Sequence, residues 1–194
     1  MMTLPNMLTI FRILLTPVFI LCLFSDFEHA QKWALIIFIV ASITDAFDGY
    51  YARKNDMATD TGRFLDPLAD KILVSSAFIS FAVLGLIDFW MVVLIIFRDL
   101  FVTGLRVVMA RKGFTMMTSK IAKSKTGVQI GIIIFTLIFL SLKGIYWSVV
   151  TDYLAFVKEY ELIYYFTMVA VLFTLYTGFT YIQENRKAIK EIMN

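Results

Sequence analysis

Apolar residues along this chain gather in six long blocks, separated by short stretches that hold most of the charged residues. Each block is long enough for a helix that crosses, or nearly crosses, a hydrocarbon core about 30 Å thick. The pattern therefore predicts an all-α integral membrane protein with six transmembrane helices. We expect these helices at about residues 7–24, 33–52, 67–87, 90–110, 127–143 and 161–182.

Basic residues are distributed unequally between the two sets of connections. The connections predicted on one side carry only Lys32 and Lys158, whereas the other side and the C-terminal end carry most of the remaining lysine and arginine. By the positive-inside rule, the basic side faces the cytoplasm. We therefore expect a multi-pass protein of the cell membrane, with both termini and the segment 45–70 cytoplasmic.

Composition agrees with a membrane protein and excludes other classes. Hydrophobic residues make up 60% of the chain, and the mean hydropathy is +0.79. The net charge of +3 is small and spread out, so we expect no nucleic acid partner. Cys22 is the only cysteine, which excludes an internal disulfide and a Cys-based zinc site. We assign no role to Cys22 or His29.

Four aspartates in the segment 45–70 form two pairs with helical spacing. Asp45 and Asp48 are three residues apart and Asp66 and Asp70 are four apart, so each pair shares one face of a helix. A short connector between the two helices lets the pairs face each other at the membrane surface. Carboxylates gathered in this way repel one another unless cations neutralise them. Oxygen ligands without His or Cys favour Mg²⁺ or Mn²⁺, and two such ions suit phosphoryl transfer.

Small residues and one arginine accompany these pairs. Gly49 and Ala52 leave room beside the carboxylates, and Gly62 lets the backbone approach a ligand. Arg53 is suited to bind a phosphate through two parallel hydrogen bonds. The alternative interpretation is that the aspartates are only interfacial caps and solvated charges.

The pattern Asp45-x2-Asp48-Gly49-x2-Ala52-Arg53-x8-Gly62-x3-Asp66-x3-Asp70 resembles the signature of the CDP-alcohol phosphatidyltransferases. The resemblance implies a single membrane domain over residues 1–194, with the signature at 45–70 and an active site open to the cytoplasm. It implies an enzyme, usually a homodimer, that transfers a phosphatidyl group from CDP-diacylglycerol to an alcohol and releases CMP.

The resemblance also implies the roles of individual residues. The four aspartates, Asp45, Asp48, Asp66 and Asp70, would hold two Mg²⁺ or Mn²⁺ ions. Asp70 would in addition be the catalytic base that takes the proton of the attacking hydroxyl. The expected contacts of CDP-diacylglycerol are Asn6, Thr9, Asp48, Gly49, Ala52, Arg53, Thr59 and Gly62.

Charged residues of the fourth and fifth predicted helices bear on the choice of alcohol. Arg98 and Asp99 lie well inside an apolar stretch, with Arg106 about two turns further on. Because an arginine facing lipid is costly, we expect these side chains to face the bundle interior or a wet cavity. Two interpretations remain open: an internal Arg–Asp network that joins helices, or an anionic acceptor bound by Arg106. Lys123 and Lys125 oppose the dipole at a helix start, which argues against a role in helix stability.

Three stretches resemble the branch of the family formed by bacterial phosphatidylglycerophosphate synthases: PNMLTIFR at 5–12, FRDLFVTGLR at 97–106 and AKSKT at 122–126. Asp99 stands where glutamate is usual in that branch, and Ala122 stands where glycine is usual. The branch implies sn-glycerol 3-phosphate as the acceptor and phosphatidylglycerophosphate as the product. The expected ligands of the acceptor phosphate are Arg106, Lys123, Lys125, Arg98, Arg12 and Arg186.

Other functions remain as alternatives. The same family with another acceptor, such as inositol phosphate, fits the basic cytoplasmic face equally. A membrane cation transporter or carrier is disfavoured, because transporters place their charges near the bilayer midplane and often within repeats. A purely structural membrane protein would tolerate the loss of Asp70. Membrane lipids are expected partners in every case.

Overall fold

The computed structural model describes the backbone of residues 4–55, 60–112, 120–186 and 189. Within these ranges, the side chains of residues 4–6, 8–9, 45–55, 60–70, 111 and 120–123 lie outside the description. The described residues form α-helices without strands. The helices are α1 (Leu4–Phe24), α2 (Ala30–Asn55), α3 (Asp60–Val83), α4 (Phe89–Arg111), α5 (Lys120–Leu142), α6 (Ser148–Glu159) and α7 (Leu162–Glu184).

The six apolar blocks correspond to the six long helices, α1 to α5 and α7. These helices contain 21 to 26 residues, which makes them roughly 31–39 Å long. Such segments become helical because only a helix satisfies its backbone N–H and C=O groups internally when no water is present. Within the described residues, Ser124–Leu142 and Leu162–Glu184 are long and apolar enough to cross a membrane.

Three details differ from the sequence-based expectation. α3 begins at Asp60 rather than near residue 67, because the helix continues beyond its apolar block into the polar segment. The connection 144–160 contains α6, which the search for long apolar blocks missed because twelve residues are too few to span a bilayer. α5 begins at Lys120 rather than near residue 127, because the helix continues beyond its apolar block into the basic segment. Lys123 and Lys125 therefore lie inside this helix and do not precede it.

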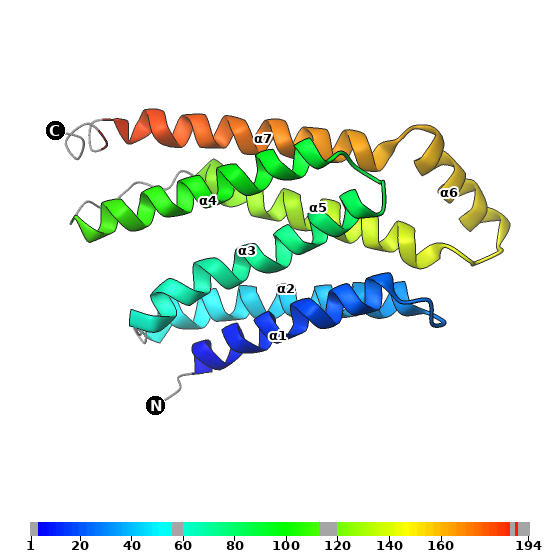
Figure 1. The fold of residues 1–194 in the computed structure, drawn as a ribbon, viewed down its shortest axis with the longest axis horizontal. Helices are drawn as coiled ribbons and strands as arrows, with labels where there is room; N and C mark the ends of the chain where they lie inside the picture. The colour runs from blue at the N-terminus through cyan, green and yellow to red at the C-terminus, as the bar shows by residue number, and fades with distance from the viewer. Residues whose placement is uncertain (1–3, 56–59, 113–119, 187–188, 190–194) are drawn as a thin grey trace.

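The long helices lie alongside one another, and both termini are at the same end of the bundle (Figure 1). α1 packs against α2 and α3, α5 packs against α2 and α7, and α7 also packs against α4. α6 lies at the opposite end and contacts α5 and α7 (Figure 1). The last turns of α2 and α4 and the first turns of α3 and α5 lie at this end too (Figure 1), which places the helical parts of the segment 45–70 there.

The distribution of side chains between interior and surface suits a lipid environment. Large apolar side chains are exposed on the outside of the single chain, including Leu21 and Phe179, each 68% exposed. Thr136 and Thr167 are fully buried, and each donates its hydroxyl to the backbone carbonyl four residues earlier, at 2.9 and 2.8 Å. A soluble monomer rarely exposes apolar surface on this scale, whereas acyl chains cover it without cost.

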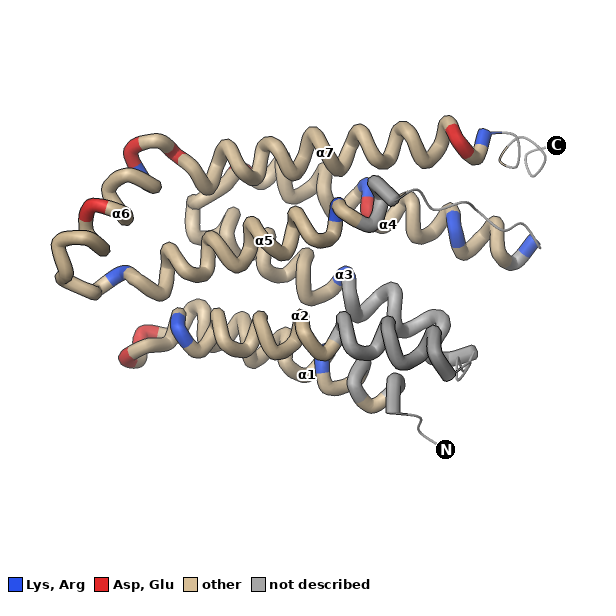
Figure 2. The backbone as a smooth tube through the Cα atoms, turned by 180° about the vertical axis from the view of Figure 1, so that it is seen from behind, with Lys and Arg blue, Asp and Glu red and all other residues tan. Residues whose placement is uncertain are grey.

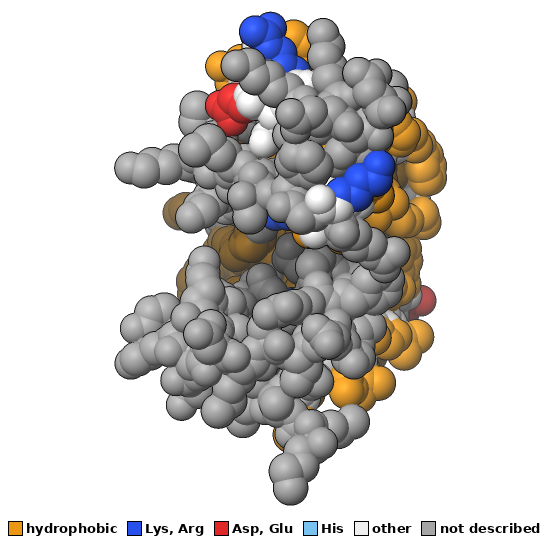
Figure 3. Space-filling model, turned by 90° about the vertical axis from the view of Figure 1, so that its left-hand side faces the viewer, with side chains coloured by type: hydrophobic (Ala, Val, Ile, Leu, Met, Phe, Trp, Pro, Cys, Tyr) orange, Lys and Arg blue, Asp and Glu red, His pale blue; other side chains and the backbone are white. Residues whose placement is uncertain are grey.

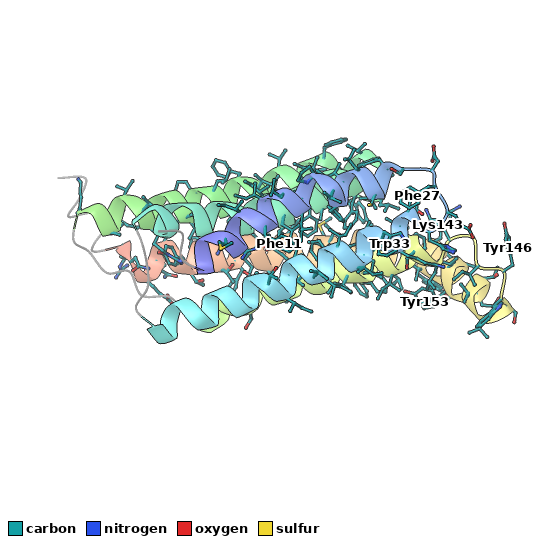
Figure 4. The ribbon with its side chains drawn as sticks, turned by 90° about the horizontal axis from the view of Figure 1, so that it is seen from below. Phe11, Phe27, Trp33, Lys143, Tyr146 and Tyr153 are labelled. Carbon is teal, nitrogen blue, oxygen red and sulfur yellow. The ribbon has the colours of Figure 1, made fainter. Side chains whose placement is uncertain are left out.

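Aromatic side chains mark the end of the bundle opposite the termini. Phe27, Trp33, Tyr146 and Tyr153 all lie there (Figure 4). Indole and phenol rings favour the interface between lipid and water, so this end has the character of a membrane boundary. Trp147 is the residue immediately before α6.

Candidate functional site

The two aspartate pairs are carried by helices that meet at the end with the termini. Asp45 and Asp48 lie in the second half of α2, and Asp66 and Asp70 lie in the first half of α3. Because both segments are helical, each pair occupies neighbouring positions on one helix face. The four side chains lie outside the described residues, so the structure provides their backbone register and no contacts. Among the side chains it does describe, no group of three His, Cys, Asp or Glu residues is placed to hold a metal ion.

The residues expected to contact CDP-diacylglycerol are placed only by their backbones. Asn6 and Thr9 lie on α1, near its start. α2 carries Gly49, Ala52 and Arg53, all within its last two turns, and α3 carries Gly62 near its beginning. The backbone of Thr59 and the side chain of Lys123 lie outside the described residues.

A buried carboxylate, Asp99 of α4, connects three helices. Its side chain is 4% exposed, and Lys125 of α5 donates a hydrogen bond to its Oδ1. Arg98 approaches the same oxygen with its Nη1 at 3.3 Å, and Lys71 of α3 places its Nζ 3.9 Å from Oδ2. The structure therefore shows the internal network that was one of the two interpretations of the Arg98–Asp99 pair. We call Asp99, Lys71, Arg98 and Lys125 the Asp99 cluster.

Sequence reasoning missed Lys71. It immediately follows Asp70, the expected base, and this adjacency was the available signal. Its Nζ links α3 to the Asp99 carboxylate of α4. One member of the Asp99 cluster is therefore the next residue in sequence after the aspartate pair of α3.

Charge is unbalanced within the Asp99 cluster. Three cations surround one carboxylate among the described side chains, and Lys125 and Asp99 are almost completely buried. In a medium of low dielectric constant, an excess of positive charge attracts an anion strongly. Figure 2 shows lysine or arginine positions together with an acidic position near the label α4, while the long middle parts of the described helices carry few charges. The arrangement suits a small ligand with one or two negative charges.

Two arginines of α4 also contact α7. Arg98 donates from Nη2 to Thr177 Oγ1 at 2.9 Å, and Arg106 donates from Nε to the Tyr181 hydroxyl at 3.5 Å. The guanidinium of Arg106 lies over the Tyr181 ring, 5.6 Å from its centre, in a cation–π contact. Arg106 is exposed, so its guanidinium is accessible to a ligand.

The remaining acceptor candidates lie apart from this group. Arg12 is buried on α1, and Arg186 is exposed just after the end of α7. Neither is among the partners of Asp99 in the described part of the chain. Figure 3 views the end with the termini, where lysine and arginine side chains are visible on the face.

The sequence is similar to those of known phosphatidyltransferases over most of its length. Residues 2–176 match the family described as CDP-alcohol phosphatidyltransferase. The chain is 38% identical over 202 residues to the CDP-diacylglycerol–glycerol-3-phosphate 3-phosphatidyltransferase of Bacillus subtilis (strain 168), covering 98% of each chain. It is 34% identical to the protein of the same name from Rickettsia felis, covering 95% of this chain and 96% of the relative. A probable phosphatidylglycerophosphate synthase of Mycobacterium tuberculosis is 46% identical over 129 residues, covering 65% of this chain and 61% of the relative.

The Asp99 cluster predicts an asymmetry between two substitutions. Asp99→Asn leaves the buried cations facing one another without a carboxylate, so we expect a loss of about 3–5 kcal/mol in the free energy of unfolding. Lys125→Gln should cost clearly less, because Asp99 keeps Arg98 and Lys71. Thermal unfolding of the purified variants in detergent measures both losses. An equal loss, or a larger one for Lys125→Gln, would contradict the charge arrangement described here.

Proposed function

The chain belongs to the CDP-alcohol phosphatidyltransferase family, and on that premise we propose that it transfers the phosphatidyl group of CDP-diacylglycerol to sn-glycerol 3-phosphate. The products are phosphatidylglycerophosphate and CMP, and the reaction is a step of phospholipid biosynthesis. Relatives named for this reaction match nearly the whole chain, which supports the choice of acceptor.

One observation carries the acceptor assignment. Among the described side chains, the Asp99 cluster gathers Lys71, Arg98 and Lys125 around one carboxylate, and Lys71 follows directly in sequence after Asp70, the residue expected to activate the acceptor. Choline, a cation, offers no anion to these side chains, and the carboxylate of serine is accompanied by its own ammonium group. The phosphate of glycerol 3-phosphate offers an anion, and its hydroxyl-bearing end then extends toward Asp70.

The aspartate pairs fit divalent cations, because they offer only carboxylate oxygens from two helix faces. We propose that Asp45, Asp48, Asp66 and Asp70 hold two Mg²⁺ or Mn²⁺ ions. When bound, such ions neutralise the charge of the pyrophosphate and stabilise the oxygen that leaves. The remaining expected contacts of CDP-diacylglycerol then lie at the start of α1, at the C-terminal end of α2 and at the N-terminal end of α3.

The protein's own residues perform the proton transfer and the positioning. Asp70 takes the proton from the 1-hydroxyl of glycerol 3-phosphate, and that oxygen attacks the phosphatidyl phosphorus. The bond from this phosphorus to the oxygen of CMP breaks, and CMP leaves. Arg98, Arg106 and Lys125 hold the acceptor phosphate, so the attacking oxygen is presented in one orientation.

The setting of this reaction is also part of the proposal. We propose one membrane domain over residues 1–194, with six transmembrane helices and with both termini and the active site on the cytoplasmic side of the cell membrane. The common end for the termini and the segment 45–70 supports this orientation, as does the excess of lysine and arginine there. A homodimer is implied by the family resemblance alone and stays a prediction.

The reaction is tested with purified protein, CDP-diacylglycerol, Mg²⁺ and labelled glycerol 3-phosphate. We expect labelled phosphatidylglycerophosphate and stoichiometric CMP from the wild type. Asp70→Asn should lose at least about 10³-fold in turnover, because an amide accepts no proton from the hydroxyl. Asp152→Asn, on α6, serves as a control of the same chemistry and should retain activity.

Other outcomes would overturn parts of the proposal. Product with inositol phosphate and none with glycerol 3-phosphate would change the acceptor while keeping the reaction. Metal-dependent uptake into liposomes without CMP release would favour a transporter. Full activity of Asp70→Asn would contradict the assignment of the base.

The orientation predicts which positions an impermeant thiol reagent reaches in intact cells. In a Cys22→Ser background, a cysteine at Tyr146 should be labelled from outside, since Tyr146 is 94% exposed at the aromatic end of the bundle. A cysteine at Arg186 should be labelled only after the membrane is permeabilised. The reverse pattern would invert the topology, and labelling of both positions in intact cells would contradict a crossing of the membrane by α7.

A further inference from the structure

The C-terminal part of α7 contacts the two acceptor arginines of α4. These α7 residues lie outside residues 5–129, the part of the chain on which the family resemblance rests. Buried residues recur along α7 at helical spacing, and toward its C-terminal end they are Thr174, Thr177, Gly178 and Tyr181. α4 packs against α7, and both helices run toward the end with the termini (Figure 1). This face of α7 therefore meets the helix that carries the two acceptor arginines.

Gly178 provides the space for the Arg98 side chain. A Cβ atom at residue 178 would lie only 3.1 Å from both Cγ and Nε of Arg98, closer than an ordinary van der Waals contact. Arg98 has little freedom to retreat, because Nη1 lies 3.3 Å from Asp99 and Nη2 lies 2.9 Å from Thr177. A larger residue at 178 would therefore displace the guanidinium from its present position.

Thr177 fixes the outer end of the same guanidinium. Its hydroxyl accepts a hydrogen bond from Arg98 and donates one to the carbonyl of Thr174 at 2.9 Å. Both functions of the hydroxyl are thus used, and its orientation is determined. The hydroxyl of Thr174 is buried and has no hydrogen-bond partner among the described atoms, which makes Thr174 a matched control.

Tyr181 supports the second arginine. Its side chain is 2% exposed, and its ring and hydroxyl are the contacts of Arg106. In the part of the chain that the structure describes, Arg106 makes no ion pair. Tyr181 therefore holds Arg106 without neutralising it, and the charge of the guanidinium remains for a ligand.

We propose that Thr177, Gly178 and Tyr181 form a seat on α7 that positions Arg98 and Arg106 for the acceptor phosphate. The inference deepens the proposed function and rests on it. The three α7 residues act through the arginines and need no contact with substrate. Holding two long side chains in place before the acceptor arrives removes an ordering cost from binding, so the seat raises affinity for the acceptor.

The test separates the KM for glycerol 3-phosphate from the KM for CDP-diacylglycerol. Thr177→Val and Gly178→Val should each raise the acceptor KM about tenfold, the factor expected for losing one hydrogen bond to a charged group. The KM for CDP-diacylglycerol should stay within about twofold of the wild type, since its expected contacts lie on α1 to α3 and in their connections. Thr177→Ser keeps the hydroxyl and should restore the acceptor KM.

The matched controls are Thr174→Val on the same face and Gly131→Ala on α5, where an added Cβ meets nothing within 4 Å. Both should behave as the wild type. The proposed seat would be overturned if the two KM values changed equally. It would also be overturned if the acceptor KM stayed unchanged in both Thr177→Val and Gly178→Val. Either result would leave the proposed reaction intact. If the wild type uses a different alcohol phosphate, the acceptor assignment is wrong. The KM of the variants for that alcohol phosphate, compared with their KM for CDP-diacylglycerol, would then decide the role of the seat.

A second measurement needs no turnover. If Gly178→Val acts through Arg98, it should lower the unfolding temperature in detergent less in an Arg98→Ala background than in the wild type. Equal shifts in the two backgrounds would show that residue 178 does not act through Arg98, and the inference would fail.

Discussion

The structure depends on the buried carboxylate of Asp99. It is held on α4 within an apolar stretch, and it is ion-paired to Arg98 on its own helix, to Lys125 on α5 and to Lys71 on α3. Isolated charges at this depth in a membrane bundle are costly, so the pairing allows three cations to remain in the interior. Among the described side chains, Asp99 thus joins α3, α4 and α5 through its cationic partners.

This arrangement links the two halves of the proposed chemistry. α3 contributes Asp70 as the expected base and Lys71 as a partner of Asp99 in consecutive residues. α4 contributes Arg98 and Arg106, which α7 supports through Thr177, Gly178 and Tyr181. The acceptor phosphate and the reacting hydroxyl are thereby brought under the control of adjoining helices, which a reaction between a soluble substrate and a membrane lipid requires.

Much of the fold follows from hydropathy, because helices in lipid must be long, apolar and internally hydrogen-bonded. This is why the six long helices occur where the apolar blocks lie. α6 was missed because a twelve-residue amphipathic helix leaves no such block, and the early start of α5 was missed because helicity continues through basic residues. The aspartate pairs were readable from their spacing, since i to i+3 and i to i+4 residues share a helix face.

The acceptor region was only partly readable. Arg98, Asp99 and Arg106 were conspicuous as charges within an apolar stretch, but their partners depend on which helices pack together. Lys71 follows the predicted site residue Asp70, but its contact with Asp99 could not be predicted from the sequence. Gly178 matters only because α4 places the Arg98 side chain against it. Arg12, proposed from the PNMLTIFR motif, and Arg186 do not join the Asp99 cluster in the described part of the chain.

The most direct test of the central claim is ligand protection against thermal unfolding of the purified chain in detergent. Millimolar glycerol 3-phosphate should raise the unfolding temperature of the wild type in a concentration-dependent manner, because a ligand that binds only the folded state stabilises it. Glycerol at the same concentration should not, and Arg106→Ala should require about tenfold more glycerol 3-phosphate for the same shift. Equal protection by glycerol, or unchanged protection of Arg106→Ala, would contradict the account of an anion site beside Asp99.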